Sequence, residues 1–217
     1  MHIKAALLLA ILAASCAGPS AWADELVASA ASPSKVLNVD VRLETGGRLS
    51  YAVKRRGEDV ISWSRLGFIL TNAPKFDAGF SVDKKTLTAH DDTWEQPWGE
   101  RQFVRNHYQE LRLDLVQKDF KNRRIAVVFR VYDDGVGFRY EFPKQEQLKD
   151  VKISDELTEF VVSKPGTAWW QVAGEVAALE HTVLKTPVRE VGTANTPMTV
   201  KTEDGTHIAF HEAALVD

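Results

Sequence analysis

The chain has 217 residues, a formal net charge of −3, 44% hydrophobic residues and 26% charged residues. These values are typical of a globular protein and exclude disorder, a collagen-like repeat or a polytopic membrane protein as a description of the whole chain. The mild acidity argues against a nucleic-acid partner, which would favour a basic surface. The length leaves no room for a full (β/α)8 barrel of about 250 residues beside a second domain.

Residues 1–23 have the pattern of a secretory signal peptide. Lys4 supplies the positive start, and residues 5–14 form an uncharged apolar stretch that is too short for a bilayer span of about 20 residues. A small-x-small motif predicts cleavage after Ala23, a periplasmic or secreted location and no transmembrane segment. The alternative is a lipoprotein cleaved before Cys16, although the sequence before that cysteine is a weak lipobox.

Cleavage after Ala23 would remove the only cysteine, so the exported protein would have no disulfides and would depend on its core for stability. Residues 24–34 are small and polar and are predicted to form a flexible leader. No internal repeat or Pro/Gly-rich linker follows, so residues 35–217 are predicted to form one domain.

From residue 36 onward, apolar and polar residues alternate with the period of two that is typical of half-buried strands. Residues 125–132 are rich in β-branched and aromatic residues, as expected for a buried central strand. The other predicted strands, mostly bounded by Gly or Asp turns, are residues 39–43, 49–53, 60–63, 111–115, 136–142, 153–162, 198–202 and 207–211. Residues 170–179 are the best helix candidate, and their helical pattern is weak. This series of short strands predicts an all-β antiparallel sandwich.

Three potential metal ligands, His207, His211 and Glu212, lie close together in the sequence. The zinc-protease motif His-Glu-x-x-His is incomplete, because Leu215 stands where the second His is needed. On a strand, His207 and His211 would lie about 13 Å apart, too far to share one zinc ion. Glu212 could serve a hard cation such as Ca²⁺ with ligands from elsewhere, and a solvated surface carboxylate is the simpler alternative.

Two pairs of adjacent acids, Asp91-Asp92 and Asp133-Asp134, lie at predicted turns. Such residues usually cap backbone amides, so we do not expect them to form the carboxylate pair of a glycosidase. Gly135-Val136-Gly137 lacks the third glycine of a phosphate loop and is predicted to form a hairpin. No Gly-x-Ser-x-Gly motif occurs, so a serine hydrolase has no support.

Four tryptophans could contribute to a sugar-binding platform, because an exposed indole stacks on the apolar face of a sugar ring. They are Trp94, Trp98, Trp169 and Trp170. Burial in the sandwich core is the favoured interpretation from the sequence pattern alone.

Three blocks of the sequence resemble the N-terminal domain of glycoside hydrolase family 97, a family of bacterial α-glucosidases and α-galactosidases. The blocks are WEQPWGE (residues 94–100) continuing into RNHYQEL (105–111), FRVYDDGVGFRY (129–140), and ANTPMT (194–199) followed by HEAAL (211–215). The resemblance covers residues 35–217. It implies an antiparallel β-supersandwich similar to galactose-mutarotase-like folds, in agreement with the predicted strands.

In this family a catalytic (β/α)8 barrel follows the sandwich and carries the general acid and the base or nucleophile. The resemblance therefore implies a chain truncated before the barrel, with a sandwich that is incomplete at its C-terminus and inactive when isolated. The intact enzyme would be exported and would hydrolyse α-glucosidic or α-galactosidic bonds of an oligosaccharide. Two alternatives remain, a stand-alone carbohydrate-binding module and a purely structural domain that docks on its own barrel.

The resemblance also implies specific site residues. The family uses a Ca²⁺ ion near the scissile bond, and Glu212 matches the carboxylate ligand that the N-terminal domain supplies. Asn195 is expected to lie near the sugar-binding site. Residues 105–108 are expected to form a buried polar network that holds the sandwich together.

Overall fold

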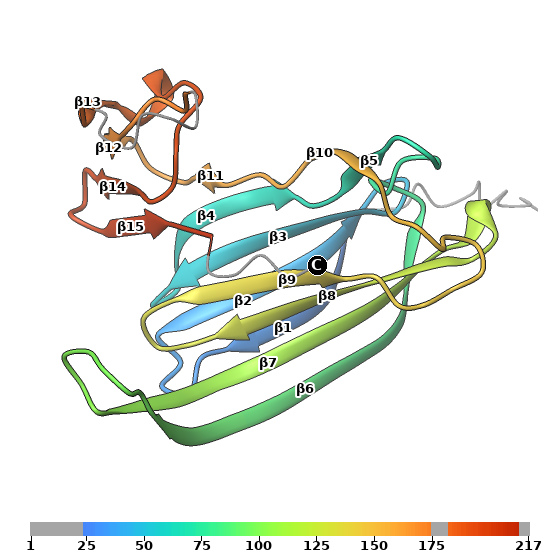
Figure 1. Cartoon of the computed structure of the whole chain (residues 1–217), viewed down its shortest axis with the longest axis horizontal. Helices are drawn as coiled ribbons and strands as arrows, with labels where there is room; N and C mark the ends of the chain where they lie inside the picture. Colours follow the sequence, from blue (N-terminus) through green and yellow to red (C-terminus); the bar gives the residue numbers. More distant parts are fainter. Residues whose placement is uncertain (1–23, 175–181, 213–217) are drawn as a thin grey trace, which may run out of the picture.

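The structure is a computed structural model that describes residues 24–174 and 182–212, and almost all of its regular structure is antiparallel β (Figure 1). The predicted signal peptide, residues 1–23, lies outside the described residues. None of the helices in the described ranges has the length and apolar character needed to cross a membrane. The prediction of an all-β antiparallel fold is confirmed.

Two large sheets form the body of the molecule. The first sheet has the order β1 (Glu25–Ala31), β2 (Leu37–Glu44), β3 (Arg48–Arg55), β4 (Glu58–Arg65) and β11 (Val161–Val162). The second sheet has the order β6 (Phe80–Glu95), β7 (Phe103–Gln117), β8 (Arg123–Val131) and β9 (Val136–Glu141). Short strands β5 (Phe68–Leu70) and β10 (Ile153–Glu156) pair beside them, and a 3-10 turn, η1 (Lys118–Phe120), joins β7 to β8.

The inner faces of these two sheets enclose the main core. Val39 and Val41 of β2 and Leu113 of β7 are all 0% exposed, as the period-two alternation predicts. The rings of Tyr51 on β3 and Phe129 on β8 lie 5.9 Å apart between centroids, so aromatic side chains bridge the two sheets directly. The body is therefore a sandwich of two antiparallel sheets.

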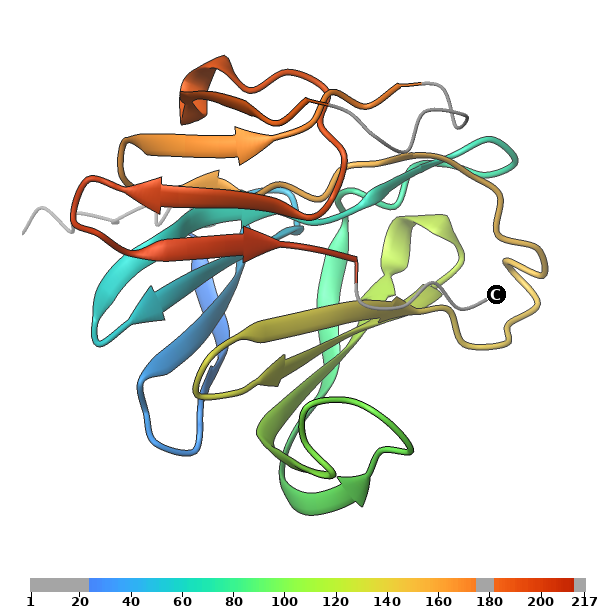
Figure 2. The same cartoon turned by 60° about the vertical axis from the view of Figure 1, so that its left-hand side comes forward.

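A third sheet lies beside this sandwich (Figure 2). Its order is β13 (Leu184–Pro187), β12 (Gly166–Trp170), β14 (Met198–Thr202) and β15 (His207–Phe210), with a 3-10 turn, η2 (Val188–Glu190), after β13. It has a small core of its own around Ala168, Trp170 and Val200. Phe210 of β15 packs against Phe160, with ring centroids 5.2 Å apart, and thereby links the third sheet to the main core.

The expectation of a flexible leader at residues 24–34 is wrong. Residues 25–31 form β1, which pairs with β2 from Glu25 opposite Leu43 to Ala31 opposite Asn38. Ala30 is 2% exposed. Small side chains do not prevent a strand, because the ladder is made by the backbone and a neighbouring strand offers free hydrogen-bonding groups. Regular structure therefore begins before residue 35.

Two other sequence predictions need correction. The helix candidate at 170–179 fails at its start, because Trp170 ends strand β12 and residues 171–174 are not helical; residues 175–179 lie outside the described ranges. The segment 153–162, predicted as one extended strand, divides into β10 and β11, which pair with different partners. The other predicted strands all correspond to strands of the structure.

Candidate functional site

Glu212 is the second residue after the end of β15, and its side chain is exposed. Strand β15 is confirmed as extended by its pairing with β14, from Met198 opposite Phe210 to Lys201 opposite His207. In the described parts of the chain, no three His, Cys, Asp or Glu side chains are placed to hold one metal ion. An accessible carboxylate fits one position of a calcium shell, and the remaining oxygen ligands would have to come from outside these parts.

Asn195 has a role in local structure. Its backbone N–H donates to the carbonyl of Gln171 at 2.9 Å, and its side-chain Nδ2 donates to the carbonyl of Val172 at 3.4 Å. These bonds join the loop before β14 to the segment that leaves β12. The side chain is exposed, so it remains accessible to a ligand as well.

The hairpin of β6 and β7 extends beyond the rest of the second sheet (Figure 1). Strand β7 pairs with β8 only over Gln109–Gln117, whereas its pairing with β6 continues to Phe103 opposite Glu95. We call residues 90–108, which form this two-stranded projection and its turn, the arm. Most side chains of the arm are exposed or half-buried.

Cross-strand side-chain contacts hold the arm. Arg105 donates two hydrogen bonds of 2.7 Å to the carboxylate of Asp91, and this contact lowers the pKa of that carboxyl. Asn106 donates to Asp92 at 3.0 Å. The rings of His90 and Tyr108 stack with centroids 4.6 Å apart. Polar and stacked pairs therefore take the place of a core in this part of the sheet.

These contacts correct two expectations. Residues 105–108 do form part of a polar network, but it lies at the surface: the side chain of Arg105 is 60% exposed, and only Tyr108 is buried. Asp91 and Asp92 belong to strand β6 and not to a turn. Asp133 does lie between strands and accepts hydrogen bonds from the backbone N–H and the hydroxyl of Ser34, as predicted for a capping residue.

The tip of the arm carries exposed aromatic side chains. Trp98 is 84% exposed, Phe103 60% and Trp94 49%. Burial in the core is therefore the wrong interpretation for Trp94 and Trp98. An open pocket of about 520 Å³ at the tip is lined by Glu95, Gln96, Pro97, Trp98, Gly99, Arg101 and Gln102.

The other two tryptophans of interest lie on β12. Trp170 is 7% exposed and its indole N–H donates to the hydroxyl of Thr186 at 3.0 Å, so core packing is confirmed for this residue. Trp169 is half-buried beside Lys185, whose ammonium lies 5.5 Å from the ring centroid. Of these four tryptophans, the two in the arm are the most exposed and the most accessible to a sugar ring.

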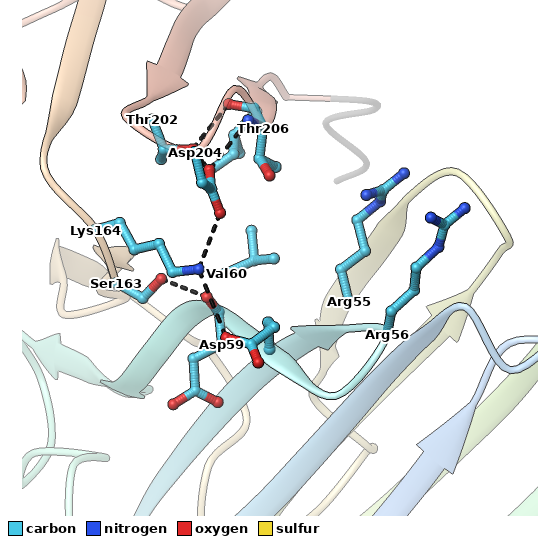
Figure 3. A pocket seen from close by; sticks show the side chains of 11 residues that line it. Arg55, Arg56, Asp59, Val60, Ser163, Lys164, Thr202, Asp204 and Thr206 are labelled. Carbon is cyan, nitrogen blue, oxygen red and sulfur yellow. Dashed lines mark hydrogen bonds and ion pairs between the residues drawn. The ribbon is translucent and has the colours of Figure 1, made fainter.

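A second pocket lies between the turn that joins β3 to β4 and the turn that joins β14 to β15 (Figure 3). The ammonium of Lys164 lies 2.9 Å from a carboxylate oxygen of Asp204 and 3.6 Å from one of Glu58. Hydrogen bonds from Thr202 and from Lys164 lower the pKa of Asp204. Figure 3 shows Arg55 and Arg56 standing apart from this contact. Lys164 thus links the third sheet to the first, which is a structural role.

Comparison with known proteins gives the family. Residues 30–217 match the family model described as Glycosyl-hydrolase 97 N-terminal. The structure superposes with a TM-score of 0.83 on a glycoside hydrolase family 97 enzyme from Pseudoalteromonas sp. strain K8 in complex with panose, at 36% sequence identity over 88% of this chain. The same values hold for the complex of that enzyme with acarbose.

The chain spans 29% of the length of that enzyme, and its described residues contain no (β/α)8 barrel. A beta-arabinopyranosidase superposes with a TM-score of 0.77 at 18% identity, over 84% of this chain and 31% of the other, which is a likeness of fold alone. The match over almost the whole chain and the 36% identity agree with the three sequence blocks. The chain therefore belongs to the N-terminal domain family of glycoside hydrolase family 97.

Proposed function

We propose that this chain is the N-terminal sandwich of an exported α-glycosidase whose catalytic groups lie outside the chain. The support is the family match over residues 30–217 together with the identity to an enzyme described in complex with panose and with acarbose. An α-glucoside or an α-galactoside is proposed as the substrate of the intact protein. We propose export on the basis of the signal-peptide pattern of residues 1–23.

Within this function, Glu212 supplies one carboxylate ligand to a calcium ion. The assignment rests on the resemblance of residues 211–215 to the family, and the position of Glu212 supports it: the residue is exposed and lies two residues after Phe210, where the pairing of β15 with β14 ends. The paired strand limits the positions that the backbone two residues later can reach, which lowers the entropy lost when the carboxylate binds a metal. Calcium, when bound, supplies a positive charge that polarises nearby oxygen atoms.

The activity is tested on two proteins. The purified 217-residue chain should show no turnover of p-nitrophenyl α-glucoside or α-galactoside, since a glycosidase needs two carboxyl groups across the scissile bond. Turnover by this chain, free of host enzyme, would contradict the proposal. The second protein is the longest product of the reading frame that contains the chain, and it should hydrolyse at least one of the two substrates.

The role of Glu212 is tested in that longer product. Glu212→Gln should lower calcium-dependent hydrolysis at least about tenfold and weaken the rise in melting temperature that calcium produces, because a neutral amide is a poorer calcium ligand. The matched control is Glu203→Gln, which alters an exposed carboxylate in the turn between β14 and β15. Equal behaviour of the two variants would rule out Glu212 as a ligand.

A further inference from the structure

The tip of the arm exposes a group of aromatic side chains that no other described residue covers. Trp98 contributes almost its whole side chain to the surface, and Trp94 and Phe103 flank it. Strand β8 does not reach this part of the hairpin, so no neighbouring strand covers it among the described residues. A cluster of exposed large apolar side chains usually marks a binding site.

The loop that carries Trp98 is held by hydrogen bonds of its own. The backbone N–H of Gln96 donates to the carbonyl of Gln102 at 3.0 Å, and the side chain of Gln96 donates to the carbonyl of Arg101. Pro97 restricts the chain, and Gly99 has a φ of +132°, which favours glycine. The indole is therefore presented by an ordered loop, so a ligand would bind at a low cost in conformational entropy.

The polar groups at the tip favour a sugar over a protein partner. Side chains of Glu95, Gln96, Arg101 and Gln102 line the pocket beside the indole. The side-chain Nε2 of Gln102 donates a hydrogen bond of 2.7 Å to the carboxylate of Glu95, and this bond orients both side chains. The amide of Gln102 and the carboxylate of Glu95 can still donate and accept further hydrogen bonds to a ligand. The centre of a protein interface is depleted in charged groups, whereas a sugar presents an apolar C–H face surrounded by hydroxyls.

We propose that the tip of the arm, residues 94–103, is a binding site for a neutral oligosaccharide, in which the Trp98 indole stacks on a sugar ring and the side chains around it bind hydroxyls. This site does not use Glu212. The choice of an α-linked glucan as ligand rests on the proposed function, whereas the site itself rests on the geometry of the arm.

The experiment titrates the 217-residue chain with panose and, separately, with maltotriose. Binding is measured by saturation-transfer-difference NMR of the sugar, because Trp98 is itself a fluorophore and its removal would confuse a fluorescence signal. We expect saturable binding with a dissociation constant in the millimolar range, and at least about a tenfold weakening in Trp98→Ala. The control is Leu87→Ala, which removes an apolar side chain on β6 that is 57% exposed, and this variant should bind the sugars as the wild type does.

Circular dichroism and the melting temperature establish that each variant is folded. Absence of saturable binding of either sugar up to about 50 mM, a concentration well above a millimolar dissociation constant, would overturn the proposal. Equal weakening in Trp98→Ala and Leu87→Ala would overturn it too. Dimerisation of the wild type that Trp98→Ala abolishes, without sugar binding, would identify the tip as a protein contact instead. Because hydrolysis is not measured, failure here is distinct from failure of the proposed α-glycosidase function.

Discussion

Strands β6 and β7 cross two very different regions of the molecule. In the body, β7 has neighbours on both sides, and Leu111, Leu113 and Leu115 are at most 3% exposed. In the arm the same two strands pair only with each other, and Trp94 and Phe103 are about half exposed or more. The backbone pairing of β6 with β7 continues through both regions. The body and the arm therefore differ in whether their side chains are packed in a core. Stability is therefore expected to be unevenly distributed along one hairpin.

The largest effect should follow from removing a core side chain. Phe129 is 0% exposed, contacts Tyr51 of the opposite sheet and contacts Phe138 on the neighbouring strand of its own sheet. Phe129→Ala should lower the free energy of unfolding by about 3–5 kcal/mol, because the substitution leaves a cavity that the sandwich fills only in part. Urea unfolding followed by circular dichroism measures this.

The control is the same substitution in the arm. Phe103→Ala should change the free energy of unfolding by less than about 0.5 kcal/mol, as is usual at an exposed site. If the two variants lost similar amounts of unfolding free energy, the side chains of the arm would contribute to stability as much as those of the body, which would contradict the uneven distribution.

A smaller, pH-dependent effect is expected at the surface of the body. Hydrogen bonds from Arg112 lower the pKa of Glu141 on β9, with Arg139 contributing in the same direction. The charged form therefore stabilises the folded state at neutral pH, and this contribution is lost as the pH falls below about 4.5 through the lowered folded-state pKa. Glu141→Gln should thus cost up to about 1 kcal/mol at pH 7 and less at pH 3.

The unfolding midpoint in urea at both pH values checks this, with Glu146→Gln as the control. Glu146 is exposed, and its substitution should change the free energy of unfolding by less than about 0.5 kcal/mol, as is usual at such a site. If the cost of Glu141→Gln were the same at pH 3 as at pH 7, the ion pair with Arg112 would not be the cause.

The smallest global effect should come from the arm itself. Arg105→Ala removes both hydrogen bonds to Asp91, so amide hydrogen exchange should become faster across residues 90–95 and 103–108 while the global unfolding midpoint stays unchanged. Native-state exchange followed by mass spectrometry measures this. Arg189→Ala, whose side chain is 84% exposed outside the arm, is the control, and faster exchange throughout the body would contradict the separation of the two regions.

Much of the fold could be predicted from the sequence, because one face of each body strand is buried and its side chains alternate accordingly. Residues 39–43, 49–53 and 111–115 were predicted as strands on that basis and lie in β2, β3 and β7. Strands β1, β5, β6, β12 and β13 were not predicted. Residues of β1 are small, and most of β6 is exposed, so neither carries a clear apolar alternation.

The sequence also indicated only some features of the candidate sites. The sequence blocks indicated the family and singled out Glu212, and they also contain Trp94 and Trp98. Composition favoured burial of the tryptophans, because an indole is usually core material. Trp98 is exposed because the arm extends past β8, and the lengths of neighbouring strands in a sheet are not encoded by any local pattern around residue 98.

By itself, the sequence determined the strand-rich class and the inward faces of the body strands, since both follow from local periodicity. The family followed from the resemblance of three sequence blocks. Tertiary structure alone decided which strand ends remain uncovered, how the third sheet joins the sandwich through Phe210 and Lys164, and that the leader becomes a strand. These features depend on contacts between residues far apart in the chain, where the free energy of pairing and packing outweighs local preference.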